Sequence, residues 1–260
     1  MILNKINNYL LPVSVPSLIA VLFFCFFSTQ ALAHPEDEFC NDVKMDPQLC
    51  AQLAELDRPA KTDGNFDLPE IKLDRSPFET ALLYTKLGVE HILPMGLDHL
   101  AFVLALLLSS TAFRPLLIQI SLFTLAHSVT LILGVLGILV LEGTWVEVAI
   151  AFSIVFVAIE NIFLKSLTYW RPLIVFCFGL LHGLGFAGAL SELGVPEDHF
   201  VSALLGFNLG VEIGQLSFAL IVFLMLYKSI KKDWYKHFVV IPGSLMIACL
   251  GSYWVIERII

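Results

Sequence analysis

The residues of this chain best suited to chemistry lie between positions 88 and 102, in the sequence G-V-E-H-I-L-P-M-G-L-D-H-L-A-F. This stretch carries His91, Asp98 and His99, and it runs directly into the apolar segment 100–108. Ionisable residues within a membrane segment are costly and usually mark a functional site. Histidine and aspartate are also ligands that divalent transition metals accept. The stretch therefore predicts a metal site, provided that other segments bring matching groups to it.

Two later apolar segments each carry a central histidine. His127 lies in F-T-L-A-H-S-V-T, and His182 lies in F-G-L-L-H-G-L-G-F. A single histidine on an apolar helix is usually a packing residue. Gly179 and Gly183 are four residues apart beside His182, and small residues let helices approach closely in lipid. Packing alone is a sufficient reason for these glycines, but their position around His182 also suits a backbone close to a bound group.

The segment from Phe200 onward carries a polar stripe within an apolar run. Asn208, Glu212 and Gln215 stand at positions i, i+4 and i+7 and share one face of a helix. A polar stripe within a lipid span faces the interior of the bundle or a wet cavity. We therefore expect this face to point toward the histidines.

Glu160 stands near the end of another apolar segment, where a carboxylate needs a partner. An ion pair with Lys165 or Arg171 is the alternative to a role at the site. The predicted metal ligands are Asp98, His99, His127, His182 and Glu212, with His91, Glu160, Asn208, Gln215 and His34 as supporting candidates. This mixed nitrogen and oxygen set suits Ni, Co, Zn, Cu or Fe, whereas a dedicated Ca or Mg site would be rich in oxygen.

The composition places this chain among integral membrane proteins. Of its 260 residues, 58% are hydrophobic and 15% are charged, and the mean hydropathy is +0.84. A soluble domain is about half apolar and about a quarter charged. The predicted partner is therefore the lipid bilayer. The net charge of −8 and the lack of a basic patch give no indication of nucleic-acid binding.

The first 33 residues have the pattern of a cleaved signal peptide: Lys5, an apolar stretch at 18–27, and the cleavage sequence Ala-Leu-Ala. An uncleaved signal anchor is the alternative. Cleavage after Ala33 would give His34 a free α-amine, so that it could chelate Cu or Ni; the alternative is a mobile tail. Residues 34–90 form an acidic extracytoplasmic segment with 13 acidic and 6 basic residues.

The remaining residues, 91–260, are predicted to form an all-α membrane bundle of six transmembrane helices. Helices are required because an irregular backbone cannot face lipid. The expected first helix begins irregularly at Pro94, and a short helix at 80–90 leads into it. The six spans are 92–108, 116–141, 146–164, 172–190, 200–227 and 238–256.

The basic residues predict the orientation of these helices. With the mature N-terminus outside, Arg114, Lys165, Arg171 and the lysines of 228–236 fall on the inner side, and the outer connections between helices carry only acidic charges. This pattern predicts a multi-pass protein of the bacterial inner membrane, with the mature N-terminus and the C-terminus both extracytoplasmic.

The motifs resemble those of the HupE/UreJ family of membrane proteins, in its signal-bearing branch. The matching sequences are the stretch at 88–102, F-T-L-A-H-S-V-T-L, V-E-V-A-I-A-F-S-I followed by E-N, F-G-L-L-H-G-L-G-F-A and F-N-L-G-V-E-I-G-Q. The resemblance implies nickel or cobalt uptake, or an accessory role toward hydrogenase or urease, with Asp98-His99 at the family's D-H position. His91 and Asp98 are separated by six residues, one more than the family commonly has, which makes His91 a weaker candidate.

Three functions are compatible with these features. The leading hypothesis is a permease or accessory protein for a divalent transition metal, with Ni or Co as its substrate and metalloenzyme-maturation or transport proteins as partners; no catalytic residue is predicted. The first alternative is an intramembrane metal-dependent hydrolase, in which a bound metal activates water. The second is a structural membrane subunit whose polar groups only lock helices together.

Overall fold

The computed structural model describes residues 76–139, 143–163, 168–192 and 195–260, and these residues are helical throughout their regular elements. The expected signal peptide, His34 and most of the expected acidic segment lie outside the described residues. The helices are α3 (Pro77–Ile92), α4 (Leu97–Ser109), α5 (Phe113–Val135), α6 (Gly143–Phe163), α7 (Arg171–Glu192), α8 (Phe200–Ile230) and α9 (Ile241–Ile259), with short turns η2 (Glu197–His199) and η3 (Lys236–Val240). The prediction of an all-α chain is confirmed for this part.

Among the described residues, four stretches are long and apolar enough to cross a membrane, namely Phe113–Val135, Thr144–Phe163, Phe200–Ile230 and Lys236–Ile259. They make the chain a multi-pass membrane protein by length and composition. The apolar part of α7, Arg171–Ala187, is shorter. Six uninterrupted spans are therefore not confirmed, although a helix stands at each of the six expected places.

The expected first span at 92–108 is instead a bent pair of helices. α3 and α4 are long and apolar enough to cross a membrane only when taken together, and their axes differ by 70° at the break between them. Pro94 has no amide hydrogen to continue the helix, and the C-cap residue Leu93 is extended. α3 itself begins with a capping box, in which Ser76 and Glu79 bond each other's backbone amides. The leading helix expected at 80–90 is thus longer and reaches the break.

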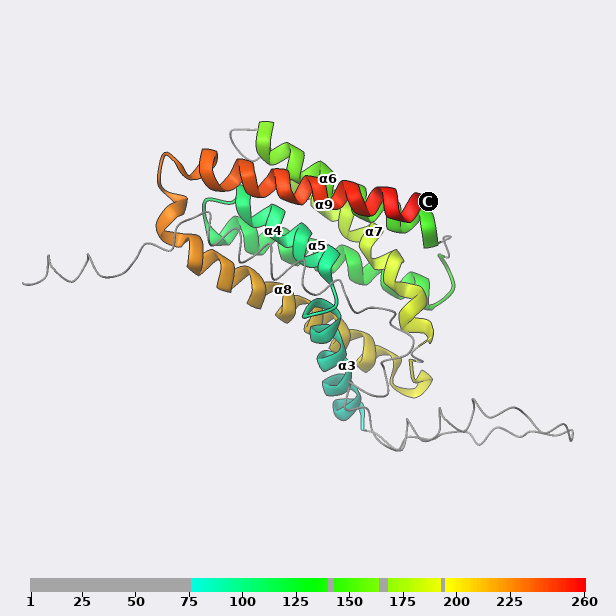
Figure 1. Ribbon diagram of the computed structural model, residues 1–260. Coiled ribbons are helices and arrows are strands. Elements are labelled where there is room, and N and C mark those ends of the chain that lie inside the picture. Colours follow the sequence, from blue (N-terminus) through cyan, green and yellow to red (C-terminus); the bar gives the residue numbers. More distant parts are fainter. Residues whose placement is uncertain (1–75, 140–142, 164–167, 193–194) are drawn as a thin grey trace, which may run out of the picture. The chain divides into compact units, whose positions relative to one another are not determined.

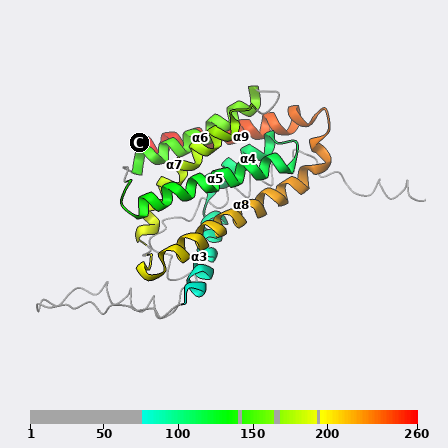
Figure 2. The same cartoon turned by 180° about the vertical axis from the view of Figure 1, so that it is seen from behind.

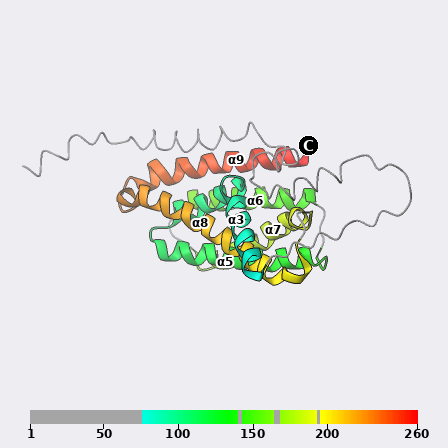
Figure 3. The same cartoon turned by 90° about the horizontal axis from the view of Figure 1, so that it is seen from below.

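The helices associate chiefly as three pairs, α3 with α8, α5 with α7, and α6 with α9. Figures 1 and 2 show α6 and α9 side by side, with α4 between this pair and α8. Figure 3 shows α3 crossing α8 in the view from below. Residues 77–90, which the sequence assigned to the acidic extracytoplasmic segment, therefore pack within the helical unit.

The α3–α8 pair depends on the absence of side chains at the crossing. A Cβ atom added at Gly206 would meet the carbonyl oxygen of Ala81, and one added at Gly210 would meet that of Thr85. An atom added at Gly210 would also lie 2.9 Å from the Cα of Gly88. Such close approach allows Cα–H contacts to carbonyl oxygens, and it is how helices associate in lipid.

We predict that Gly210→Ala lowers the free energy of unfolding by about 1–3 kcal/mol, because the added methyl group collides with backbone atoms that cannot turn away. The matched control is Gly243→Ala in α9. Its Cβ would meet only the flexible end of Leu108, at 3.0 Å, and alanine favours a helix by up to about 1 kcal/mol over glycine. Thermal unfolding in detergent measures both variants, and equal stabilities for the two would contradict this account of the α3–α8 crossing.

Candidate metal centre

Three histidines from three helices form a group that is compact enough to hold one ion. His91 of α3, His99 of α4 and His127 of α5 each offer a ring nitrogen, and these three atoms lie within 4.8 Å of one another. The ring centroids of His91 and His99 are 4.9 Å apart, and those of His99 and His127 are 5.5 Å apart. We call these three residues the histidine group.

The bend between α3 and α4 is what brings His91 to His99. Along one continuous helix, residues eight positions apart would be separated by about 12 Å. Because the chain is non-helical between Ile92 and Leu97, the axis of α4 is bent by 70° from that of α3, and the two histidines face each other across the break. His91, which we ranked lower from its spacing, lies in the group because the non-helical residues 93–96 between the two helices allow it to lie beside His99.

His182 joins the same neighbourhood through the α5–α7 pair. A Cβ atom at Gly183 would collide with the carbonyl oxygen of His127, so the two backbones touch where their histidines stand. Thr130 of α5 donates a hydrogen bond of 2.7 Å to the carbonyl of Leu180 in α7 and holds the pair in register. The His182 ring lies 5.0 Å from that of His99, although His182 is not one of the three residues whose nitrogens converge.

A serine orients His182. The Ser153 hydroxyl donates to the carbonyl of Ile150 at 2.7 Å, and the same oxygen shares a hydrogen bond of 3.2 Å with Nε2 of His182. With the hydroxyl hydrogen given to Ile150, the Ser153 oxygen can accept from an Nε2–H group of His182, and in that tautomer Nδ1 keeps its lone pair. An oxygen that accepts from the second ring nitrogen is the usual way to orient a metal-binding histidine.

The histidine nitrogens are buried, and several have no hydrogen-bond partner among the described residues. They are Nε2 of His91 and His99, both ring nitrogens of His127, and Nδ1 of His182. The exposed fraction is 6% for His99, 0% for His127 and 1% for His182. Buried polar atoms are normally paired, and each one left unpaired costs about 1–3 kcal/mol. Converging imidazoles without partners fit a transition metal ion, which would take up their free lone pairs.

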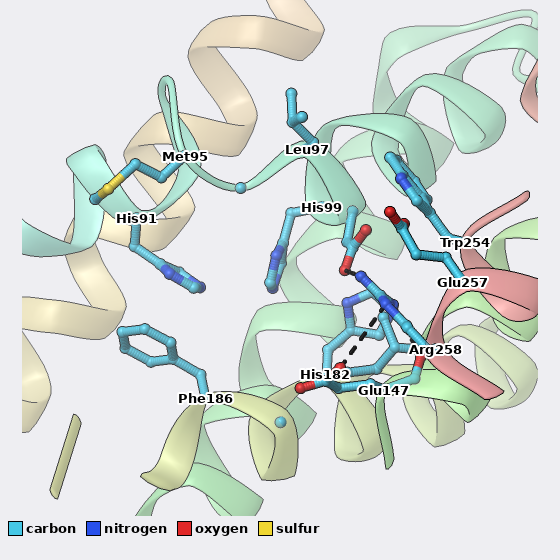
Figure 4. Close-up of a pocket in the computed structure, with 14 residues that line it drawn as sticks. His91, Met95, Leu97, His99, Glu147, His182, Phe186, Trp254, Glu257 and Arg258 are labelled. Atoms are coloured by element: carbon cyan, nitrogen blue, oxygen red, sulfur yellow. Dashed lines mark hydrogen bonds and ion pairs between the residues drawn. The ribbon is translucent and has the colours of Figure 1, made fainter. Parts of the chain in front are cut away.

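A cavity of about 390 Å³ leads to these side chains. His91, His99 and His182 line one part of it, and Glu147 of α6 and the last turns of α9 line another. Figure 4 shows the rings of His91 and His99 beside Phe186, with Trp254, Glu257 and Arg258 reaching in from α9. The site is therefore open on the side where α6 begins and α9 ends.

Asp98, one of the predicted ligands, lines this cavity, but its carboxylate is paired with an arginine. Its Oδ2 atom lies 2.7 Å from Nη2 of Arg258. Asp98 is not one of the three residues whose ligand atoms converge. It stands in the first turn of α4, directly before His99, and the two neighbouring side chains have different partners.

The polar stripe on α8 meets hydroxyl groups of α5 and not the histidines. Glu212 accepts a hydrogen bond of 2.7 Å from Ser121, Asn208 accepts one of 2.6 Å from Ser128, and Gln215 accepts one of 3.2 Å from Thr124. The prediction that these three residues share an inward face agrees with this geometry. None of them lines the cavity or belongs to the histidine group.

Glu160 makes the ion pair that we considered as its alternative role. Its Oε2 atom lies 2.7 Å from Nη1 of Arg171, and the two side chains are 9% and 3% exposed. Arg171 also donates to Gln119 of α5, to Asn161 of α6 and to Ser109 at the end of α4. This buried network joins four helices away from the cavity, so Glu160 has a structural partner.

Arg258 and Glu257 are not among the predicted site residues, because the expected sixth span, 238–256, ends before them. The charge pattern nevertheless gives an indication of Arg258, since an arginine on the side expected to lie outside departs from the positive-inside pattern. Glu147 lies in the motif V-E-V-A-I-A-F-S-I but is not one of the predicted ligands.

We predict that Glu160→Ala lowers the free energy of unfolding by about 3 kcal/mol or more, because it leaves the buried Arg171 guanidinium without its counter-charge. The control is Lys86→Ala. This residue pairs with Glu90 at 3.5 Å, but its side chain is 55% exposed, and exposed pairs contribute about 0–1 kcal/mol. Scanning fluorimetry in detergent compares the two variants, and a Glu160→Ala protein as stable as the control would refute the structural role.

Comparison with known proteins supports the resemblance in the motifs. The family model described as HupE / UreJ protein matches residues 68–258, well over half of the chain. Searches of curated proteins and of solved structures find no match. The matched region contains the histidine group, His182 and the cavity. The chain belongs to the HupE/UreJ family.

Proposed function

We propose that this protein binds a divalent transition metal ion at the histidine group and carries it through the bilayer or hands it to an accessory partner, with Ni²⁺ or Co²⁺ as the substrate. The observation that carries the proposal is the convergence of three imidazole nitrogens within 4.8 Å. Each of the three rings has at least one buried nitrogen without a hydrogen-bond partner among the described residues. Nickel and cobalt handling is also what the family resemblance implies. Partners that mature hydrogenase or urease would suit the accessory role.

The donor set favours a transition metal over the common hard cations. Imidazole nitrogen suits Ni, Co, Zn, Cu and Fe, whereas Ca and Mg prefer oxygen ligands. Three imidazoles leave coordination positions that water, Asp98 or His182 can fill. A permeation site must bind the ion well enough to admit it and weakly enough to release it, and a partial ligand set of this kind meets both needs.

The cavity supplies a route to the histidine group from one side. Under the charge-based orientation, the start of α6 and the end of α9 face the extracytoplasmic side of a bacterial inner membrane, so the cavity opens there. The acidic residues of the segment at 34–90 would raise the cation concentration on that side of the membrane. Toward the other side, Phe102 and Phe123 pack against His182, and the Arg171 network lies beyond them.

Two alternatives are less well supported. A zinc-type hydrolase would use three imidazoles and an open coordination position. Ser128 and Glu212, two groups that could do acid–base work, are bonded along the α5–α8 contact and do not line the cavity. A purely structural subunit would pair its buried polar groups, whereas five buried histidine nitrogens have no hydrogen-bond partner among the described residues.

We predict that His99→Ala and His127→Ala weaken Co²⁺ binding by the purified protein at least tenfold, because each removes one of three ligands. Isothermal titration measures this affinity, and visible absorption of Co²⁺ reports its ligands. His237→Ala is the control, since His237 is exposed and lies outside the group. Full affinity in both variants would exclude the site.

Uptake of radioactive nickel and cobalt into proteoliposomes then tests transport. Wild-type protein is expected to accumulate metal, and His127→Ala protein is expected to lose most of this uptake. Stoichiometric metal binding without uptake above that of empty liposomes would rule out the permease and favour the accessory role.

A further inference from the structure

A single guanidinium reaches across the cavity that leads to the histidine group. Arg258, near the end of α9, places Nη2 at 2.7 Å from Oδ2 of Asp98. Its Nη1 donates to the carbonyl oxygen of Glu147 at 2.9 Å, and its Nε lies 3.9 Å from the Glu147 carboxylate. The guanidinium carbon also lies 5.9 Å from the centre of the Trp254 ring. Figure 4 shows Arg258 and Trp254 entering the cavity together.

This position is unexpected for a site that takes a cation. A fixed positive charge opposes the entry of another cation at short range, and here it also occupies the carboxylate nearest in sequence to His99. Three carboxylates line the cavity with Arg258, namely those of Asp98, Glu147 and Glu257. At full ionisation they exceed the single guanidinium by two negative charges, which is the charge that a divalent ion brings.

Arg258 makes one contact with α4 and its other contacts within the α6–α9 pair. Glu147 and Trp254 belong to α6 and α9, the pair to which Arg258 belongs, while Asp98 belongs to α4. If Asp98 turned away, Arg258 would keep the carbonyl and carboxylate of Glu147 and the face of Trp254. Losing Asp98 therefore does not leave the guanidinium without partners.

The other internal arginine shows what a permanent pair looks like in this protein. Arg171 and Glu160 are 3% and 9% exposed, and Arg171 has further partners on α4, α5 and α6. Arg258 and Asp98 are 19% and 22% exposed. The Asp98–Arg258 pair is thus more accessible than the Arg171–Glu160 pair and lines the cavity, so it is the one that an entering ion can reach.

We propose that Arg258 is a displaceable internal cation that holds Asp98 until the metal arrives. An ion at the histidine group takes the Asp98 carboxylate as a further ligand, and Arg258 remains on Glu147 and Trp254. Arg258 thereby lowers the affinity of the site and favours release of the substrate. This role rests on the proposed metal site, and it makes Arg258 a positioning residue for Asp98.

The first test measures Co²⁺ affinity of the full-length protein by isothermal titration. Arg258→Gln is expected to bind about tenfold more tightly, because one nearby positive charge is gone and Asp98 is free. Arg258→Lys, which keeps the charge, is expected to stay within about threefold of wild type. Arg114→Gln is the matched control, since Arg114 is exposed and lies outside the cavity, and it should change nothing.

Asp98→Asn separates this mechanism from a general charge effect. If Asp98 is what Arg258 withholds, most of the gain from Arg258→Gln should disappear when Asp98→Asn is already present, because only the effect of the lost positive charge remains. Unchanged or weaker binding by a folded Arg258→Gln protein would overturn the proposal, and so would an equal gain in the Asp98→Asn background. Failure of the metal site itself is seen separately, as Co²⁺ binding that does not depend on His99 and His127.

The second test needs no variant. Phenylglyoxal modifies accessible arginines, and mass spectrometry locates the products in the wild-type protein with and without Co²⁺. Arg258 labelling should rise at least twofold with Co²⁺, while the buried Arg171 stays unmodified and the exposed Arg114 reacts equally in both samples. Arg258 labelling that stays constant or falls under saturating Co²⁺ would show that the metal does not release it.

Discussion

The close approach of helix backbones at glycine is the constraint on which the rest of this structure depends. In lipid, apolar side chains gain little by meeting one another rather than acyl chains, so helices associate where their backbones can touch. Gly206 and Gly210 admit carbonyl oxygens of α3, and Gly183 admits the carbonyl oxygen of His127. These contacts fix α3 on α8 and α5 on α7. Three of the histidine-bearing helices, α3, α5 and α7, are thus positioned by glycine.

The polar groups inside the bundle fall into two classes once the helices are placed. Asn208, Glu212 and Gln215 accept hydrogen bonds from hydroxyls of α5 and stabilise the contact between α5 and α8. Five buried nitrogens of His91, His99, His127 and His182 lack such partners among the described residues. The paired groups stabilise contacts between helices, whereas the unpaired nitrogens are free to bind a ligand. This difference in hydrogen bonding, more than residue type, distinguishes the scaffold from the candidate site.

The two internal arginines extend the same distinction to charge. Arg171 is surrounded by partners from several helices and has no direct access to water. Arg258 stands in the cavity with one partner across it and the others on its own helix pair. The bundle thus has a permanent ion pair near one end and a releasable one near the other, with the histidine group between them along the chain's helices.

Much of this protein could be predicted from its sequence, because the relevant physics is local. Apolar runs predict helices, the helical period places Asn208, Glu212 and Gln215 on one face, and the motifs around His99, His127 and His182 predict the family. The pairing of Glu160 with Arg171 was one of two possible roles, since a carboxylate at that depth requires a partner.

Only the tertiary structure decided which faces meet. The helical period says which residues share a face, but it does not say which helix lies opposite, because several helices of the bundle carry apolar faces and small residues that suit close packing. So the polar stripe of α8 was expected near the histidines and instead meets Ser121, Thr124 and Ser128. The bend after Ile92 places His91 beside His99, and the approach of α9 to α4 pairs Asp98 with Arg258. These outcomes depend on contacts between residues far apart in the chain, which no local pattern encodes.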